Sequence, residues 1–374
     1  MIAHLTAWVV SGAVVLSAPF MGQIRAMLRS AFPGHFAAVV AGVVGVAVIA
    51  AVAGALTRVR DQWAFRYAAI LGGVGAAAAY SFATASGTPE VDAVERVHFL
   101  EYGLISLLFY RAWRGAADVS IVALPIAAGL IVGTLEEWFQ WFIPNRVGEA
   151  RDVLLNLVAI GCGLAFSMGV DPPRAFSWRL RRGSAAAIGL WSGAAALLFA
   201  LFVDSVHLGH EVRAIGVARF RSRYTSGELA SHARERIERW KVSPPTTLVR
   251  LSREDQYMDE GLWHIRRRNA SWQAGDFEAA WGENAILEAF FAPVLDTPSY
   301  ATPGISRWPA EQRDDAGRRR PAGAGEYVSH AEPYPLVLWP RPLFRLIAGA
   351  CAVLPALAGL AWERRRANAA VAAV

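Results

Sequence analysis

The side chains that could do chemistry gather in two short stretches of the chain, residues 98–102 and 136–156. They are His98, Glu101, Tyr102, Glu136, Glu137, Gln140, Arg146, Glu149, Arg151, Asp152 and Asn156. A histidine grouped with carboxylates can move protons, and an arginine beside carboxylates and amides can hold a polar ligand. A third interpretation is structural, in which buried polar residues hold helices together.

Their spacing places these residues on shared helix faces. His98 lies three residues before Glu101 and four before Tyr102, so the three side chains share one face of a helix. The same spacing recurs in the second stretch, in the pairs Glu136–Gln140, Glu137–Gln140 and Asp152–Asn156. Between those pairs, Pro144 and Asn145 predict a break between two helices.

The elements that must carry these faces are long apolar blocks. Hydrophobic residues make up 55% of the 374 residues, above the roughly 45–50% of soluble domains. Each block is near the ~20 residues that a helix needs to cross the hydrocarbon core. The blocks are residues 5–22, 35–57, 67–85, 97–112, 119–137, 152–170, 185–203 and 343–362. The sequence therefore predicts an all-α fold, a polytopic membrane helix bundle of about eight transmembrane helices.

Arginine placement predicts how the bundle is oriented. Cytoplasmic loops carry extra arginine and lysine, and four arginine-bearing segments fall on one side if the chain crosses eight times. These segments are residues 57–66, 111–118, 171–184 and 364–366. We therefore expect both termini in the cytoplasm and residues 204–340 outside. Arg25 and Arg29, between the first two blocks, are exceptions to this pattern.

The same topology brings the two polar stretches to one depth. The fifth block is apolar as far as Leu135, so Glu136 and Glu137 lie at its outer end. His98 begins the fourth block and Asp152 begins the sixth, also at that end. Polar residues from three helices are therefore expected to converge near the outer membrane boundary, where a charge costs less than at the bilayer centre.

These residues resemble the VanZ-like family of bacterial membrane proteins. The first matching block opens a span with a His-Phe pair and continues with Glu-Tyr-Gly: His98, Phe99, Glu101, Tyr102 and Gly103. The second has an acid three residues before a glutamine, then Pro-x-Arg, an aspartate, and an asparagine four residues on: Glu137, Gln140, Pro144, Arg146, Asp152 and Asn156. A glycine often follows that asparagine by three residues, and Ala159 stands there instead. The resemblance covers residues 5–170.

The resemblance implies a role in the cell envelope, because the family's founding member is associated with low-level resistance to teicoplanin. It does not imply a reaction. We expect a binding protein that holds a lipid-linked envelope precursor or a lipophilic glycopeptide at the outer leaflet. The expected ligand-binding residues are His98, Glu101, Tyr102, Glu137, Gln140, Arg146, Asp152 and Asn156. The alternatives are a membrane enzyme or proton-coupled transporter that uses His98, Glu101, Glu137 and Asp152, and a purely structural envelope protein.

The bilayer is the expected partner, and the sequence predicts no cofactor, no metal site and no nucleic-acid partner. Basic and acidic residues are equal in number between His207 and Pro335, so the net charge of +6 does not gather on a soluble face. His207, His210 and Glu211 lie close together. Their spacing is not that of a His-Glu-x-x-His zinc site, however, and no third ligand is evident.

The segment between the last two blocks predicts a small extracytoplasmic helical domain. Helix starts are indicated by Thr225 with Glu228, by Ser252 with Asp255, and by Asp276. Residues 296–340 are rich in Pro, Gly and charge and predict an extended or mobile tether. The expected domains are a VanZ-like bundle at 1–184, a seventh transmembrane helix at 185–206, the helical domain at 207–295, the tether at 296–340, and a last helix with a basic cytoplasmic tail at 341–374.

Overall fold

The computed structural model describes residues 1–143, 146–173, 175–242, 253–298, 304–321, 323, 325–332 and 334–372. It is mostly helical, and the chain forms two compact units. Unit 1 comprises Met1–Phe139, Ala150–Phe202 and Arg345–Val374, and unit 2 comprises Gln140–Glu149 and Val203–Phe344. Pro144, Asn145 and Ser252, which the sequence analysis used as a helix break and a helix start, lie outside the described residues.

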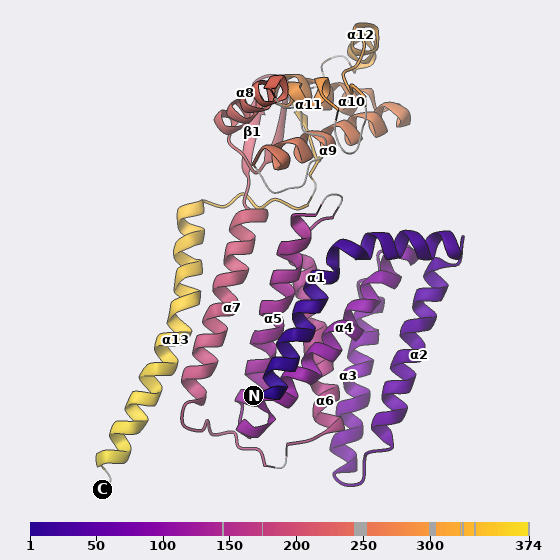
Figure 1. Cartoon of the computed structure of the whole chain (residues 1–374). Coiled ribbons are helices and arrows are strands. Elements are labelled where there is room, and N and C mark those ends of the chain that lie inside the picture. Colours follow the sequence, from indigo (N-terminus) through magenta and orange to yellow (C-terminus); the bar gives the residue numbers. More distant parts are fainter. Residues whose placement is uncertain are drawn as a thin grey trace. The chain divides into compact units, whose positions relative to one another are not determined.

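Unit 1 is built from long helices that alternate in direction along the chain (Figure 1). They are α1 (Ile2–Ala31), α2 (Phe36–Leu56), α3 (Trp63–Ala83), α4 (Pro89–Trp113), α5 (Ser120–Trp141), α6 (Ala150–Val170), α7 (Ser184–Val206) and α13 (Arg341–Ala372), with a 3-10 turn, η1, at Arg114–Ala116. Among the described residues, six helices are long and apolar enough to cross a membrane: α1, α2, α5, α6, α7 and α13. The chain therefore has the character of a multi-pass membrane protein, while spans formed by α3 and α4 stay a prediction.

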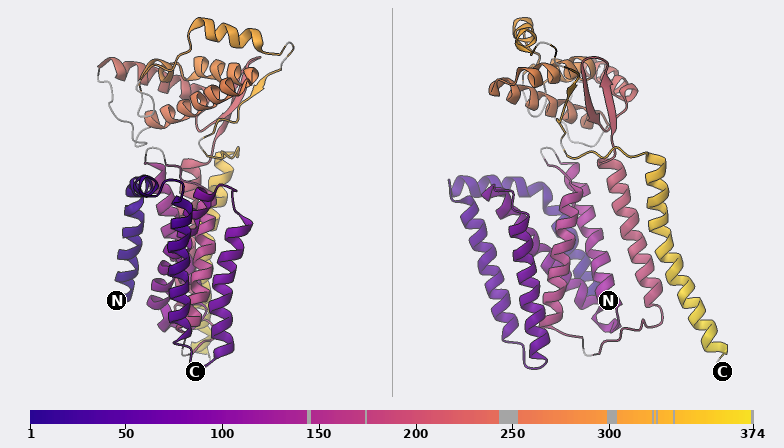
Figure 2. Two further views of the ribbon diagram at one scale, coloured as in Figure 1. Left: turned by 90° about the vertical axis from the view of Figure 1, so that its right-hand side faces the viewer. Right: turned by 180° about the vertical axis from the view of Figure 1, so that it is seen from behind.

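Helix α1 bends sharply in its middle. Pro19 lies inside the helix, where its ring displaces the preceding turn and its missing N–H removes a backbone hydrogen bond. The part after the bend runs across the neighbouring helices instead of along them, and Figure 2 shows it end-on. Arg25 and Arg29, the exceptions to the arginine pattern, belong to this transverse part, and Arg29 pairs with Glu90 at the start of α4.

Small residues allow α7 and α13 to pack closely. A Cβ placed on Gly189 would stand 2.2 Å from the carbonyl oxygen of Pro355, and one on Gly193 would stand 2.2 Å from that of Ala352. Both distances are far below a normal contact, so only glycine fits at these two positions. This spacing of small residues, four apart, is the pattern that brings helix backbones together in membranes.

The connections α2–α3, α4–α5 and α6–α7, which carry the arginines that the sequence placed on one side, lie at one end of unit 1 (Figure 1). Arg114 pairs with Asp171, and Arg366 near the C-terminus donates a hydrogen bond to the carbonyl oxygen of Leu180. Asp118 accepts from the backbone N–H of Ser120 at 2.9 Å, at the start of α5. These contacts join the connections after α4 and α6 to the end of α13, so the arginines that the sequence placed on one side do share an end of this unit.

Unit 2 combines helices with a small sheet. The strands are β1 (His210–Ala214), β2 (Ala218–Ser222) and β3 (Tyr327–Val328), in the order β1-β2-β3, with β1 antiparallel and β3 parallel to β2. The helices are α8 (Ser226–Val242), α9 (Arg253–Ala274), α10 (Phe277–Phe290), α11 (Ala292–Asp296) and α12 (Ala310–Arg319). The core between them includes Val212, Phe220, Leu229, Tyr257, Met258, Leu262, Ile286, Leu287 and Phe291.

Two expectations about this unit are wrong. The domain is not purely helical, because residues 210–222 form a hairpin whose apolar and arginine side chains alternate between its faces. The segment 296–340 is not simply an extended tether, because its described residues include α12 and the strand β3. Two helix starts are confirmed. Thr225 and Glu228 exchange side-chain-to-backbone hydrogen bonds, and the Asp276 side chain accepts from the N–H of Ala279 at 3.1 Å.

Candidate functional site

Helix α4 presents a histidine, a glutamate and a tyrosine on one face. The helix begins with Pro89, which suits the first position because no hydrogen bond is lost there. Acidic residues in its first turn stabilise the helix by interacting with the positive end of its dipole. Nine residues further on, the face opens with His98, whose ring is stacked on that of Tyr102 with centroids 6.3 Å apart. Glu101 lies on the same face, as the three-residue spacing predicts.

Helix α5 supplies the acid that meets this face. The hydroxyl of Tyr102 donates a hydrogen bond of 2.5 Å to Oε2 of Glu136. Tyr102 is fully buried and Glu136 is 6% exposed. The bond therefore lies in an interior where losing one partner would leave the other without a replacement from solvent.

Glycines on α5 allow α6 to pack closely against it beside Tyr102 and Glu136. A Cβ on Gly129 would stand 2.6 Å from Cδ1 of Ile160, so the two helices touch there. One turn on, a Cβ on Gly133 would stand 3.4 Å both from Nδ2 of Asn156 and from Oη of Tyr102. The side chains of Asn156 and Tyr102 therefore both lie beside Gly133. Asn156 is fully buried, and neither of its amide atoms has a hydrogen-bond partner among the described residues.

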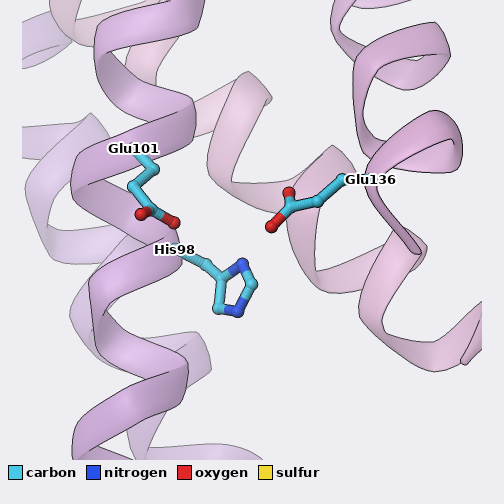
Figure 3. A group of neighbouring side chains, drawn as sticks. All are labelled: His98, Glu101 and Glu136. Carbon is cyan, nitrogen blue, oxygen red and sulfur yellow. The ribbon is translucent and has the colours of Figure 1, made fainter. Parts of the chain in front are cut away.

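His98, Glu101 and Glu136 point toward one another (Figure 3). One ring nitrogen and one oxygen of each carboxylate all lie within 4.8 Å of one another. Nδ1 of His98 is buried and has no hydrogen-bond partner within the described part of the chain. The group thus combines two anionic oxygens with an imidazole, and it can accept hydrogen bonds from a hydroxyl or ammonium group, exchange a proton, or ligate a cation.

The structure brings part of the predicted site together. His98, Glu101 and Tyr102 from the first polar stretch meet Glu136 from the second, and Asn156 from the second stretch lies with Tyr102 beside Gly133. Glu137 is 1% exposed on α5 but is not a member of the group of three ligand side chains, and Asp152 lies in the first turn of α6.

Gln140 and Arg146 belong to unit 2. There Nη2 of Arg146 donates a hydrogen bond to Oε1 of Gln140, and the adjacent Trp141 donates to the hydroxyl of Tyr334 at 3.1 Å. The guanidinium of Arg223 lies 4.5 Å from the centroid of the Trp141 ring. These contacts explain why the end of α5 forms part of this unit. A ligand-binding role for Gln140 and Arg146 stays a prediction.

Sequence reasoning chose Glu137 and missed the importance of Glu136. The signal was present, because Glu136 continues the row formed by Gly129 and Gly133 at spacings of four and three residues. That row is where α5 approaches α6 and Tyr102 most closely. An acid at the end of a row of glycines is carried into the helix interface, whereas the next residue is turned by roughly 100° away from it.

Unit 2 holds a second buried polar group that sequence reasoning did not find. Glu283 accepts hydrogen bonds from the hydroxyls of Tyr327 at 2.9 Å and Ser329 at 2.6 Å, and its other oxygen lies 2.6 Å from Nδ1 of His264. Burial and the nearby Glu283 carboxylate raise the pKa of Tyr327. Because Glu283 is fully buried and its two oxygens are occupied, this group attaches the β3 segment to α9 and α10 and does not present a ligand site.

Comparison with known proteins gives this chain no relative. It matches no family model, no curated protein and no solved structure.

Proposed function

We propose that this chain is a VanZ-like integral membrane protein of the bacterial cell envelope that crosses the cytoplasmic membrane eight times. The eight spans would be α1 to α7 and α13. The alternating direction of these helices and the shared end of the arginine-bearing connections support it (Figure 1). On this proposal both termini are cytoplasmic and the segment 204–340 is extracytoplasmic.

The cluster of His98, Glu101, Tyr102 and Glu136 is the binding site for the polar headgroup of a lipid-linked envelope precursor or lipophilic glycopeptide. The observation that carries this proposal is the meeting of the two polar stretches in the interior, through the 2.5 Å bond from Tyr102 to Glu136. Ionisable residues inside a membrane bundle are costly and by default mark functional sites. Two carboxylates that face a common space are suited to accept hydrogen bonds from the hydroxyl and amino groups of a sugar.

An apolar cavity lies against the face of α4 opposite to the cluster, and none of the four cluster residues lines it. It has a volume of about 590 Å³, within the ~300–1,000 Å³ of ordinary ligand sites. Its lining comes from α2, α3, α4 and α6 and includes Val44, Phe82, Phe99, Leu104 and Phe166. Its cationic side chain is Arg96. The cavity is therefore a separate place for a hydrocarbon chain, with an anionic group near Arg96, and it is not part of the headgroup site.

A Glu101→Gln variant tests the binding role against a purely structural one. Glu101 is only half-buried, so its amide isostere should reach normal membrane levels and melt within a few degrees of the parent. If the cluster binds a headgroup, the variant should lose the affinity for a fluorescent lipid-linked disaccharide-peptide precursor and any change in teicoplanin susceptibility that the parent confers. Glu90→Gln, half-exposed in the first turn of α4, is the matched control and should keep both.

Two results would overturn the proposal. If the parent binds no envelope precursor and changes no susceptibility, the binding role is wrong. If Glu101→Gln lowers abundance and melting temperature in proportion to the phenotype, the cluster is a structural one. A variant that keeps its affinity for the precursor but no longer exchanges a proton during turnover would instead support the enzyme or transporter alternative.

A further inference from the structure

We propose that His98, Glu101 and Glu136 bind one divalent metal ion of the zinc class inside the bundle. The inference goes beyond the proposed headgroup site, because it concerns the binding of the ion alone. Its basis is the geometry of Figure 3, in which three side chains from two helices converge. Their ligating atoms, one nitrogen and two oxygens, lie within 4.8 Å of one another.

The donor set matches the chemistry of zinc. Zn²⁺ takes imidazole nitrogen and carboxylate oxygen at about 2.0–2.2 Å, so two ligands of one tetrahedral ion lie about 3.3 Å apart. The distances between the three ligating atoms must therefore shorten by at most about 1.5 Å when the ion binds. Rotation of the two long glutamate side chains supplies that distance. Three protein ligands leave a fourth position open, which is the arrangement of zinc sites that act on a ligand and not of purely structural ones.

The surroundings supply what a metal site needs outside its ligands. Metal-bound carboxylates are oriented by neighbouring hydrogen bonds, and Tyr102 provides one by donating to Oε2 of Glu136 at 2.5 Å. Nδ1 of His98 is buried with no hydrogen-bond partner in the described part of the chain, which leaves the ring without a competing attachment there.

Asn156 is an independent sign of a ligand at this place. Its side chain is completely buried, and both of its amide atoms are without a hydrogen-bond partner among the described residues. A buried amide in that condition costs free energy. Its Nδ2 and Oη of Tyr102 both lie 3.4 Å from the same point beside Gly133. A metal ion with a bound water or anion beyond Glu136 would give this amide a partner.

Charge balance favours the same conclusion. Two carboxylates within 4.8 Å of each other repel when both are ionised. Moving them out of water adds to that cost. A doubly charged cation neutralises both, and the neutral imidazole completes its coordination without adding charge. Because one proton can compensate only one carboxylate, a dication compensates this group more completely.

The test is zinc binding by the purified full-length protein in detergent, stripped with EDTA and titrated with zinc sulfate in a calorimeter. The parent should bind one Zn²⁺ per chain. His98→Gln and Glu136→Gln should each weaken binding at least about 100-fold, and Tyr102→Phe, which keeps all three ligands, by about 10–100-fold. His35→Gln and Glu90→Gln change an exposed histidine and a half-exposed glutamate of the same unit and should leave the affinity unchanged.

Binding that is absent in the parent, or equally strong in His98→Gln, would overturn the proposal. A second measurement covers the case in which a ligand variant does not fold. X-ray absorption at the zinc edge of the parent should show one imidazole nitrogen, oxygen neighbours and no sulfur. A spectrum with sulfur, or with two or more imidazoles, would place the ion elsewhere. Since neither measurement uses a lipid, failure here leaves the headgroup proposal to its own test.

Discussion

Replacing Gly193 by alanine should destabilise the protein by separating α7 from α13. The added Cβ would stand 2.2 Å from the carbonyl oxygen of Ala352, whereas an ordinary contact is 3.4–4 Å. The helices must therefore part by about 1.2 Å at this crossing. A gap of 0.5–1 Å already forfeits a quarter to a half of a van der Waals contact, and crowding a well-packed interface costs about 1–3 kcal/mol.

The matched control is Gly349→Ala on α13, because no atom lies within 4 Å of a Cβ at that position. Alanine is a better helix former than glycine by up to about 1 kcal/mol. The same gain accompanies Gly193→Ala, but the loss of packing exceeds it. The two substitutions should thus change stability in opposite directions, although the chemical change is identical.

The assay is thermal unfolding of both variants in one detergent, followed by tryptophan fluorescence and by retention of the monodisperse peak in size exclusion. Gly193→Ala should lower the melting temperature by a few degrees, at about 2–4 °C per kcal/mol. Gly349→Ala should leave it unchanged or raise it. A Gly193→Ala protein that melts at or above the parent would refute the close approach of the two helices.

Three further predictions concern unit 2 and its location. Burial raises the pKa of Glu260, against the opposing effect of the Ser222 hydroxyl, so the folded state favours the protonated acid. The stability this contributes is present below the unfolded pKa of ~4.3 and is lost as pH rises through the folded pKa. The melting temperature of Glu260→Gln should therefore rise relative to that of the parent as the pH increases above ~4.3, and a constant difference would contradict this. Thr225→Ala removes one half of the exchange with Glu228 and should cost about 0.5–2 kcal/mol of unfolding free energy, measured by urea denaturation; an unchanged midpoint would show that the cap is not formed in solution. A cysteine introduced by Ser231→Cys, in a background without the two native cysteines, should react with an impermeant thiol reagent in intact spheroplasts, and labelling only after lysis would reverse the proposed orientation.

The long helices could be predicted from the sequence because their signal is local. Most of the blocks are long runs with few charged residues, so their helices follow from length and composition. Helix α4 begins at Pro89, eight residues before the predicted block. Its first turns are polar, so hydropathy does not reveal them. They are stabilised by the proline at the helix start and by acidic residues that interact with the helix dipole. The bend of α1 could also have been predicted, because Pro19 lies in the middle of the helix. The bend was not predicted, because Pro19 stands within an apolar run.

The candidate site could be predicted in part for the same reason. The spacing of His98, Glu101 and Tyr102 identified one face of one helix. The identity of the partner acid depended on how α5 is rotated against α4, and this rotation is set by contacts such as that of Gly133 with Tyr102. Periodicity describes one helix at a time, so it could not choose between Glu136 and Glu137.

The sheet was beyond prediction because its closure is not local. Strand β2 has an alternating pattern that indicates a strand, but β3 is only two residues long and lies in a segment rich in glycine and proline. The composition of β3 does not indicate that β2 is its neighbouring strand. The buried bonds from Tyr327 and Ser329 to Glu283 hold it there, and these require three distant segments to be folded together.

The parallel pairing of β3 with β2 has a consequence for the order of folding. Ala218 pairs with Tyr327, so most of unit 2 must be synthesised before its sheet can be completed. Until then β2 presents an unpaired edge, the kind of surface on which chains associate with one another. Long-range pairing of this type is slow because a large loop must close first. Chains ending before Tyr327 should therefore be far more prone to aggregate than chains that include it, and the last steps of folding should coincide with the emergence of α13 from the ribosome.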